Sequence, residues 1–197
     1  MTEAAAVGLG VELELQAIAN TLAVSAGLPA DRYLSLNASP SVVVTGRLVD
    51  VLARCERPII VEVTEHEEAH GVDLSPALGR LRAAGHRIAL DDGGAGYAGL
   101  TRLLELRPEV VKLDRAIIAG IDTDPVRQAM VTAAVAFVAG VGSSLVAEGV
   151  ETAREEEALR TLGVRVAHGY LFGRPAPVAY FRSPGAPPLG EEPHFHT

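Results

Sequence analysis

The chain has 197 residues and a formal net charge of -8 at pH 7, and 48% of its residues are hydrophobic. This length and apolar content suit one globular domain with a sizeable core. The acidic balance argues against DNA or RNA as a partner, because phosphate backbones are held by clustered Lys and Arg, and no apolar run is long enough for a membrane segment.

Two residue types are unusually scarce. Lys112 is the single lysine among 17 basic residues, so this position either needs a compact ammonium, which guanidinium cannot replace, or kept lysine by chance. The one cysteine, Cys55, excludes an internal disulfide. Since the N-terminus also lacks the basic start of a signal peptide, we expect a cytoplasmic protein.

The predicted elements alternate between β-rich runs and amphipathic helical segments. A helix is predicted over about residues 9–27, and six strands follow it, at 32–39, 58–65, 86–92, 109–114, 143–149 and 164–172. This alternation is typical of an α/β fold with buried parallel strands. We expect one domain over residues 1–182, followed by a flexible Pro/Gly-rich tail over 183–197.

Polar side chains occur at the C-terminal ends of all six predicted strands. They are Asn37, Glu62, Glu65, Asp91, Asp92, Lys112, Asp114, Glu148, Glu151 and His168. In a parallel α/β barrel these ends meet at one face, where active sites are built, whereas an open doubly wound sheet concentrates function at one switch point. The pattern therefore favours a barrel. Several carboxylates at one face would repel one another, so it also indicates divalent metal, with Lys112 as a further positive charge.

Two short motifs indicate other functions. Residues 94–99 read Gly-x-Gly-x-x-Gly, as a dinucleotide-binding loop does, and Asp114 lies about where a ribose-binding acid belongs. However, Asp91 and Asp92 would place two negative charges beside the pyrophosphate. Residues 66–70 read His-Glu-x-x-His, which binds zinc from one face of a helix, but this run starts where a strand ends and glycine follows it at once. We favour a loop in both places.

Six stretches, in order and in rough register, resemble the EAL-domain family of cyclic di-GMP phosphodiesterases, which have a (β/α)8 barrel of the TIM type. They are LNASP, VEVTE, DDGGAGYAGL, VKLD, VAEGVET and HGYLFGRP. The resemblance runs from about residue 6 to 181. It implies a domain that binds cyclic di-GMP and hydrolyses it to the linear dinucleotide pGpG.

Four positions correspond to metal ligands of that family. Asn37, Glu62 and Asp91 resemble the ligands of a first Mg²⁺ or Mn²⁺ ion, and Asp91 with Asp92 would bridge to or hold a second. Two such ions lower the pKa of a bound water and neutralise phosphate oxygens, so hydroxide attacks phosphorus in line and the 3′-oxygen leaves. The expected cofactors are therefore two Mg²⁺ or Mn²⁺ ions.

The other strand-end residues have further roles in the resemblance. Lys112 resembles the lysine that contacts the attacking water, Glu148 the carboxylate that completes the site below the metals, and Glu65 the residue that braces the Asp-Asp-Gly-Gly loop. Asp114 and Glu151 are open between a role in the site and that of a helix N-cap.

The sequence departs from the family in two respects. It shows no counterpart of the first two barrel strands, one of which carries a metal-binding Glu, so we expect six strands and two open edges. Gly93 stands where the family usually has Phe, and His168 where it has Gln, although His168 can still donate one hydrogen bond. We expect a weakened phosphodiesterase or, alternatively, an inactive EAL domain that is a cyclic di-GMP receptor or a protein-interaction module. A homodimer and upstream sensory domains are also expected.

Overall fold

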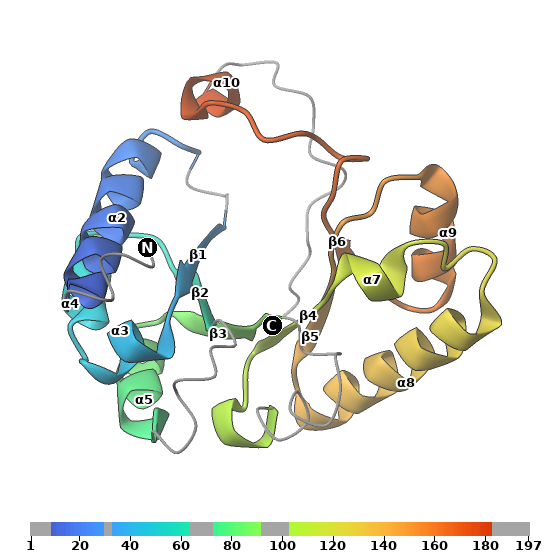
Figure 1. Ribbon diagram of the computed structural model, residues 1–197, viewed down its shortest axis with the longest axis horizontal. Helices are drawn as coiled ribbons and strands as arrows, with labels where there is room; N and C mark the ends of the chain where they lie inside the picture. The colour runs from blue at the N-terminus through green and yellow to red at the C-terminus, as the bar shows by residue number, and fades with distance from the viewer. Residues whose placement is uncertain (1–8, 30–32, 64–72, 92–102, 183–197) are drawn as a thin grey trace. The chain divides into compact units, whose positions relative to one another are not determined.

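The computed structural model describes residues 9–29, 33–63, 73–91 and 103–182 (Figure 1). They fall into two units, one with the described residues up to Ala89 together with Val178–Arg182, and one from Leu90 to Pro177. Six strands follow one another in the sheet in the same order as in the chain, β1-β2-β3-β4-β5-β6. The predicted α/β class and its six strands are therefore confirmed.

The first unit contains the first strands and the helices that accompany them. Its strands are β1 (Leu34–Ala38), β2 (Ile59–Val63) and β3 (Arg87–Leu90), whose last residue begins the second unit. Its helices are α2 (Gly10–Ser25), α3 (Pro40–Val44), α4 (Leu48–Leu52), α5 (Ser75–Ala83) and α10 (Val178–Arg182). β1 and β2 pair in parallel. In β2 every second residue is buried, so Glu62 lies on the opposite face from the apolar residues beside it.

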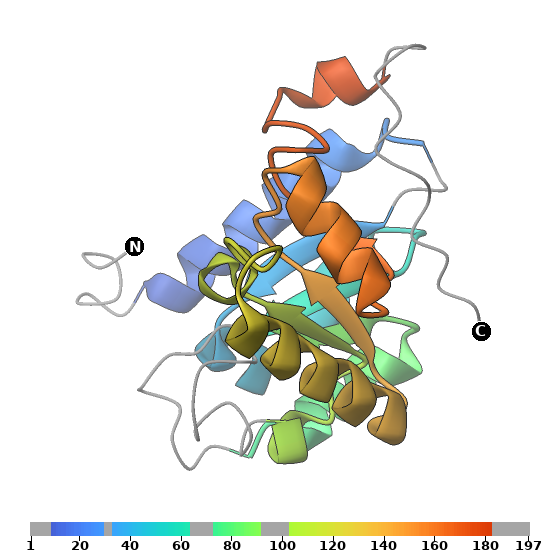
Figure 2. The ribbon, with the colours of Figure 1, turned by 90° about the vertical axis from the view of Figure 1, so that its right-hand side faces the viewer.

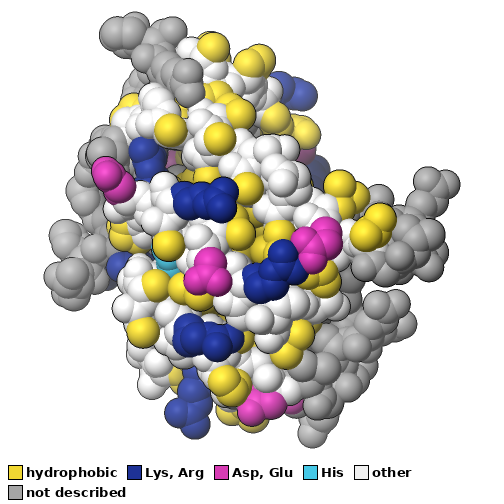
Figure 3. Space-filling view, turned by 90° about the vertical axis from the view of Figure 1, so that its left-hand side faces the viewer, with side chains coloured by type: hydrophobic (Ala, Val, Ile, Leu, Met, Phe, Trp, Pro, Cys, Tyr) yellow, Lys and Arg dark blue, Asp and Glu magenta, His cyan; other side chains and the backbone are white. Residues whose placement is uncertain are grey.

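Helix α2 packs on α3 and α4. It buries Leu15, Ile18 and Leu22, which lie on one face of a helix. On the face of the molecule that Figure 3 shows, basic and acidic side chains are interspersed among apolar ones. An ion pair joins α2 to the start of α4, because Arg47, the N-cap of α4, donates from both terminal nitrogens to Glu12, with Nη2 2.9 Å from Oε2. These hydrogen bonds lower the pKa of Glu12.

The buried histidine His86 lies directly before β3. Its Nδ1 accepts a hydrogen bond from the backbone N–H of Ile59, the first residue of β2, at 3.2 Å. A ring nitrogen can accept only while it carries no proton, so this contact requires the neutral form. Burial lowers the pKa of His86 below its ordinary value. The unfolded chain therefore binds a proton at this residue more readily than the folded chain does.

We expect His86 to make the free energy of unfolding depend on pH. Its contribution is fully present above the ordinary histidine pKa of about 6.5, and it falls as the pH drops toward the lower folded-state pKa, by at most about 1.4 kcal/mol per pH unit. The variant His86→Gln keeps an acceptor oxygen for Ile59 but does not titrate, so it should lose this slope. Urea unfolding at about pH 7.5 and about pH 5.5 measures it. Equal slopes in the variant and the wild type would exclude His86 as the cause.

The second unit repeats the pattern of strand and helix. Its strands β4 (Val110–Leu113), β5 (Ser144–Ala147) and β6 (Val166–Ala167) pair in parallel, β4 with β5 and β5 with β6. Its helices are α7 (Arg115–Ile118), α8 (Pro125–Val141) and α9 (Ala153–Thr161). Figure 2 shows α8 and α9 in front of these strands, and α8 packs against β5. Gly142 ends α8 at φ 75°, a left-handed conformation that glycine adopts without strain.

Some predicted features lie outside the described residues. They are Glu65, Asp92, Gly93, the motifs at 66–70 and 94–99, and the tail at 183–197. Within the part of the chain that is described, no helix is long and apolar enough to cross a membrane.

Candidate active site

Two of the proposed metal ligands face each other across β1 and β2. Asn37 and Glu62 are partners in the parallel register, so their side chains leave the sheet on the same face. The hydroxyl of Ser35 donates to Oε1 of Glu62 and holds this carboxylate at the strand face. We did not single out Ser35 from the sequence. Its position two residues before Asn37, on the same side of the strand, is the signal that could have found it.

The turn that follows Asn37 is held by a glutamate from α2. Glu14 accepts the backbone N–H of Ser39 at 2.6 Å and its hydroxyl at 2.8 Å. The Ser39 hydroxyl in turn accepts the N–H of Val42 at 3.3 Å and caps α3. The end of β1 is therefore fixed by charge-assisted hydrogen bonds, which are stronger than neutral ones.

In the second unit, four of the predicted residues lie together as the Lys112 cluster, which consists of Asp91, Lys112, Glu148 and His168. The Lys112 side chain in β4 is largely buried, and its Nζ lies 3.2 Å from Oδ1 of Asp91, the residue directly after β3. Lys112 also pairs with Oε1 of Glu148, directly after β5. The same oxygen contacts Nε2 of His168, directly after β6, at 2.7 Å. Strand ends that are far apart in the sequence thus bring these four groups together.

Glu148 is ionised in this cluster. Burial by itself raises the pKa of Glu148, but hydrogen bonds from His168 and Lys112 outweigh it, so the pKa lies below its ordinary value. A carboxylate is only an acceptor, which indicates that Nε2 of His168 carries the proton in this contact. The cluster therefore presents an ammonium between two carboxylates.

Asp114 and Glu151, for which the sequence allowed either a role in the site or a helix N-cap, have different roles in the structure. Asp114 is the N-cap of α7, and its Oδ1 accepts the N–H of Ala116 at 2.7 Å. Glu151 caps no helix, because Thr152 is the N-cap of α9. Glu151 instead pairs with Nη1 of Arg115 at 2.5 Å. Sequence reasoning missed Arg115, which joins the turn after β5 to the start of α7.

The close contact between Arg115 and Gly149 gives a testable packing effect. Nη1 of Arg115 donates to the Gly149 carbonyl at 3.0 Å, and a Cβ added to Gly149 would lie 2.7 Å from Cβ of Arg115. Gly149→Ala should therefore cost more than the roughly 1–2 kcal/mol that alanine pays in the left-handed region. Gly142→Ala is the matched control, since its φ is similar and nothing lies near the added carbon. Thermal unfolding compares the two variants, and equal losses would show that Arg115 moves aside freely.

The chain matches the EAL domain family over residues 1–175. It belongs to this family. Cyclic di-GMP phosphodiesterase RocR of Pseudomonas aeruginosa is 40% identical over 128 residues, which are 62% of this chain and 32% of that protein. Probable cyclic di-GMP phosphodiesterase PdeA of Escherichia coli is 32% identical over 183 residues, 87% of this chain and 25% of that protein. This EAL domain therefore spans a third or less of the length of these two relatives.

Solved EAL-type structures have the same fold as this EAL domain. Klebsiella pneumoniae BlrP1, solved with calcium and cyclic di-GMP and with manganese and cyclic di-GMP, matches with a TM-score of 0.75 and 33% identity. The match covers 84% of this chain and 45% of that chain. The EAL domain of Mycobacterium smegmatis DcpA matches with a TM-score of 0.74 and 29% identity, over 85% and 79% of the two chains. The predicted TIM-type barrel, represented by six parallel strands, is confirmed.

The donor types of this EAL domain suit a hard divalent cation. Asn37 offers an amide oxygen, and Glu62 and Asp91 offer carboxylates, which are the ligands that Mg²⁺ and Mn²⁺ prefer. Asn37 and Glu62 belong to the first unit, and Asp91 belongs to the second. Within either unit, the described residues contain no group of three or more His, Cys, Asp or Glu placed to hold a metal ion. Asp92 lies outside those residues.

Proposed function

We propose that this EAL domain binds cyclic di-GMP and hydrolyses it to linear pGpG with two divalent metal ions. The observation that supports the proposal most is the Lys112 cluster, in which a buried ammonium and two carboxylates come together from three strand ends. The similarity to relatives named cyclic di-GMP phosphodiesterases, and to a structure with cyclic di-GMP and manganese, supports the substrate and the metal.

We assign the metal ions to the oxygen ligands that resemble those of the family. Asn37, Glu62 and Asp91 would hold the first ion, and Asp91 with Asp92 would hold the second. Bound divalent ions lower the pKa of a coordinated water and neutralise charge on the phosphodiester. Ser35 and Glu14 would keep β1 and Glu62 in place for this purpose, because both already bind the strand ends that carry the ligands.

The residues of the Lys112 cluster would orient the attacking water. The Lys112 ammonium is held by Asp91 and Glu148, so its donors have a fixed direction and add positive charge beside the phosphate. The lowered pKa of Glu148 makes this carboxylate a weak base at neutral pH. Its role in our proposal is therefore to position Lys112, and that of His168 is to hold Glu148.

Chromatography of reaction mixtures tests the proposal directly. The purified chain with cyclic di-GMP and Mn²⁺ should form pGpG, and EDTA should stop the reaction. Saturable binding of cyclic di-GMP without turnover at high protein concentration would select a receptor. Absence of both binding and turnover would leave a protein-interaction module.

The receptor is the second candidate because of His168. The family usually has glutamine here, whereas the Nε2 of this histidine binds Glu148. A planar amide has two N–H donors and an acceptor oxygen, whereas the single N–H of neutral imidazole is already given to Glu148, so His168 has only an acceptor left for a ligand. Nucleotide binding without efficient hydrolysis is the expected result of a site that is held together but misaligned for turnover.

Helix α8 supports the expected homodimer, which stays a prediction. Its large exposed apolar side chains are those of Val126, Met130, Phe137 and Val141. Phe137 and Val141 line a groove of about 370 Å³ together with Leu103 and Leu104. Covering such side chains with a second copy of the chain would remove apolar surface from water.

A further inference from the structure

The turn after β5 holds the backbone beside His168. The N–H of Val150 donates to the carbonyl of His168 at 3.1 Å, and the N–H of Leu171 donates to the carbonyl of Val150 at 3.0 Å. Because the His168 ring contacts Glu148, any movement of this turn, residues 149–152, would move that contact as well.

The turn is itself held by a buried glutamate in the first turn of α9. The side chain of Glu155 accepts three backbone N–H groups at 3.0 Å each, that of Gly120 on Oε1 and those of Glu151 and Thr152 on Oε2. The Thr152 hydroxyl accepts the N–H of Glu155 at 3.2 Å, which completes a capping box. Burial alone raises the pKa of Glu155, but these hydrogen bonds outweigh it and lower the pKa.

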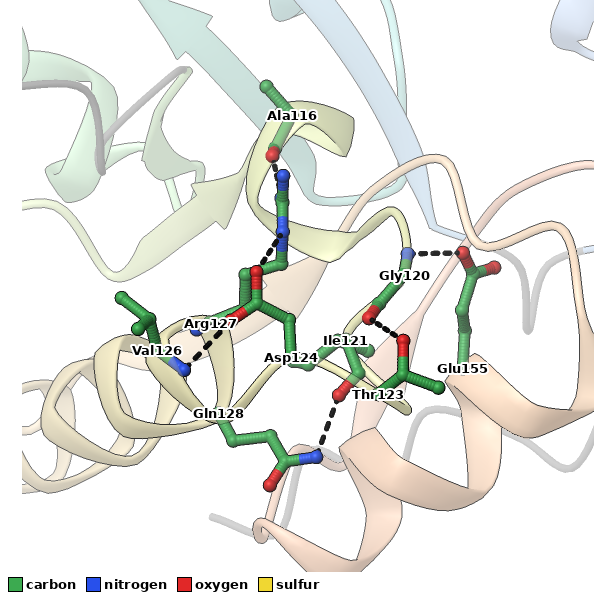
Figure 4. Close-up of polar contacts among 9 residues, drawn as sticks. All are labelled: Ala116, Gly120, Ile121, Thr123, Asp124, Val126, Arg127, Gln128 and Glu155. Carbon is green, nitrogen blue, oxygen red and sulfur yellow. Dashed lines mark hydrogen bonds and ion pairs between the residues drawn. The ribbon is translucent and has the colours of Figure 1, made fainter.

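Of the three partners of Glu155, Gly120 is the most distant in the sequence, and it lies in a turn that hydrogen bonds connect to α8. Figure 4 shows Glu155 reaching this turn from α9. The Gly120 carbonyl accepts the Thr123 hydroxyl at 3.3 Å, and Gln128 of α8 donates to the carbonyl of Ile121 at 2.8 Å. Glu155 thus ties the turn after β5 to a segment that has its own anchors.

We propose that Glu155 is a positioning residue for the Lys112 cluster, because it fixes residues 149–152 to the turn after α7 and thereby holds His168 against Glu148. The role of that cluster in nucleotide chemistry rests on the proposed function. Helix capping alone does not require an acid here, since glutamine is equally suited to a capping box. The carboxylate is needed because the third donor, Gly120, requires an acceptor on the other oxygen.

The Glu155→Gln variant separates these two roles. Its carbonyl oxygen can still accept from Glu151 and Thr152 and keep the cap, but its NH₂ group would then face the N–H of Gly120, donor against donor. Hydrogen exchange at the Gly120 amide should become about tenfold faster or more, as expected for an amide that loses its protein acceptor and opens to water. The matched control is Glu157→Gln, which makes the same charge change on the same helix at a side chain that is 71% exposed.

The chemical shifts of the His168 ring nitrogens, measured by NMR, test the positioning role. A loss of stability confined to helix α9 would leave these shifts unchanged. In Glu155→Gln the Nε2 resonance should shift toward that of a histidine without a carboxylate partner, and the affinity for cyclic di-GMP should fall about tenfold. An unchanged His168 resonance, or unchanged exchange at Gly120, would overturn the proposal. If the wild type neither binds nor hydrolyses cyclic di-GMP while the resonance still shifts in the variant, the proposed function fails and the positioning role stands.

Discussion

Replacing Lys112 by methionine is expected to destabilise the metal-free chain by about 3 kcal/mol at neutral pH, because removing one partner of a buried ion pair leaves the other charge uncompensated. The Lys112 side chain is 10% exposed, and its ammonium lies 3.2 Å from Asp91 and also pairs with the largely buried Glu148. Methionine keeps most of the apolar stem, so the loss reports the charge rather than a cavity. Urea unfolding in the presence of EDTA measures the change.

The penalty should also depend on pH in a defined direction. In the wild type the pKa of Glu148 is lowered, so its contribution is present above the unfolded-state pKa and is lost as the pH falls through the folded-state pKa. Without Lys112, the effect of burial on Glu148 is no longer offset by the ammonium, so the pKa of Glu148 is higher than in the wild type. As the pH falls, Glu148 of the variant binds a proton and the cost of its unpaired charge disappears. The difference in the free energy of unfolding between variant and wild type is therefore largest near neutral pH.

A double variant identifies the origin of the penalty. Lys112→Met combined with Glu148→Gln removes both charges and should recover part of the stability that the single variant loses at neutral pH, since replacing both members of a buried pair costs less than removing one. If the double variant is as unstable as the single one, the unpaired Glu148 charge is not the cause. Turnover of cyclic di-GMP should be lost in both variants, because both lack the ammonium.

The strands and their polar ends could be predicted because both are local patterns. The four residues of β4 are all buried, and their apolar run is visible in the sequence. The position of Lys112 near the end of that run, and of Glu148 directly after β5, placed both at one edge of a parallel sheet. The structure brings them into contact, as strand order and register require.

Contacts between connectors could not be predicted in this way. The capping box of Thr152 and Glu155 is a local signal, readable as Thr-x-x-Glu before a helix. The hydrogen bond from Gly120 to Glu155 joins residues 35 positions apart, and it depends on how two turns fold. The pairing of Arg115 with Glu151 is of the same kind. No spacing rule relates such residues, because the path of each turn sets the distance.

Replacing Asp91 by alanine is expected to abolish metal-dependent hydrolysis of cyclic di-GMP, by about a thousandfold or more if the metal ions supply several kcal/mol to the transition state. Asp91 is the one proposed ligand shared by both ions. Its side chain is 26% exposed, more than that of Lys112, and Glu148 still pairs with the ammonium when Asp91 is gone. The loss of stability should therefore be smaller than in Lys112→Met. Asp50→Ala, at an exposed acid of α4, is the control.

Metal binding provides a second measurement that needs no turnover. An ion that binds only the folded chain raises the free energy of unfolding by RT ln(1 + [L]/Kd), where [L] is the free ion concentration. Mn²⁺ should therefore raise the unfolding temperature of the wild type and of Asp50→Ala but not of Asp91→Ala. If Asp91→Ala keeps this rise, or keeps hydrolysis within a few-fold, Asp91 is not a ligand. A wild type that is stabilised by Mn²⁺ and binds cyclic di-GMP without cleaving it would be the receptor. The two measurements together therefore separate a wrong ligand from an inactive domain.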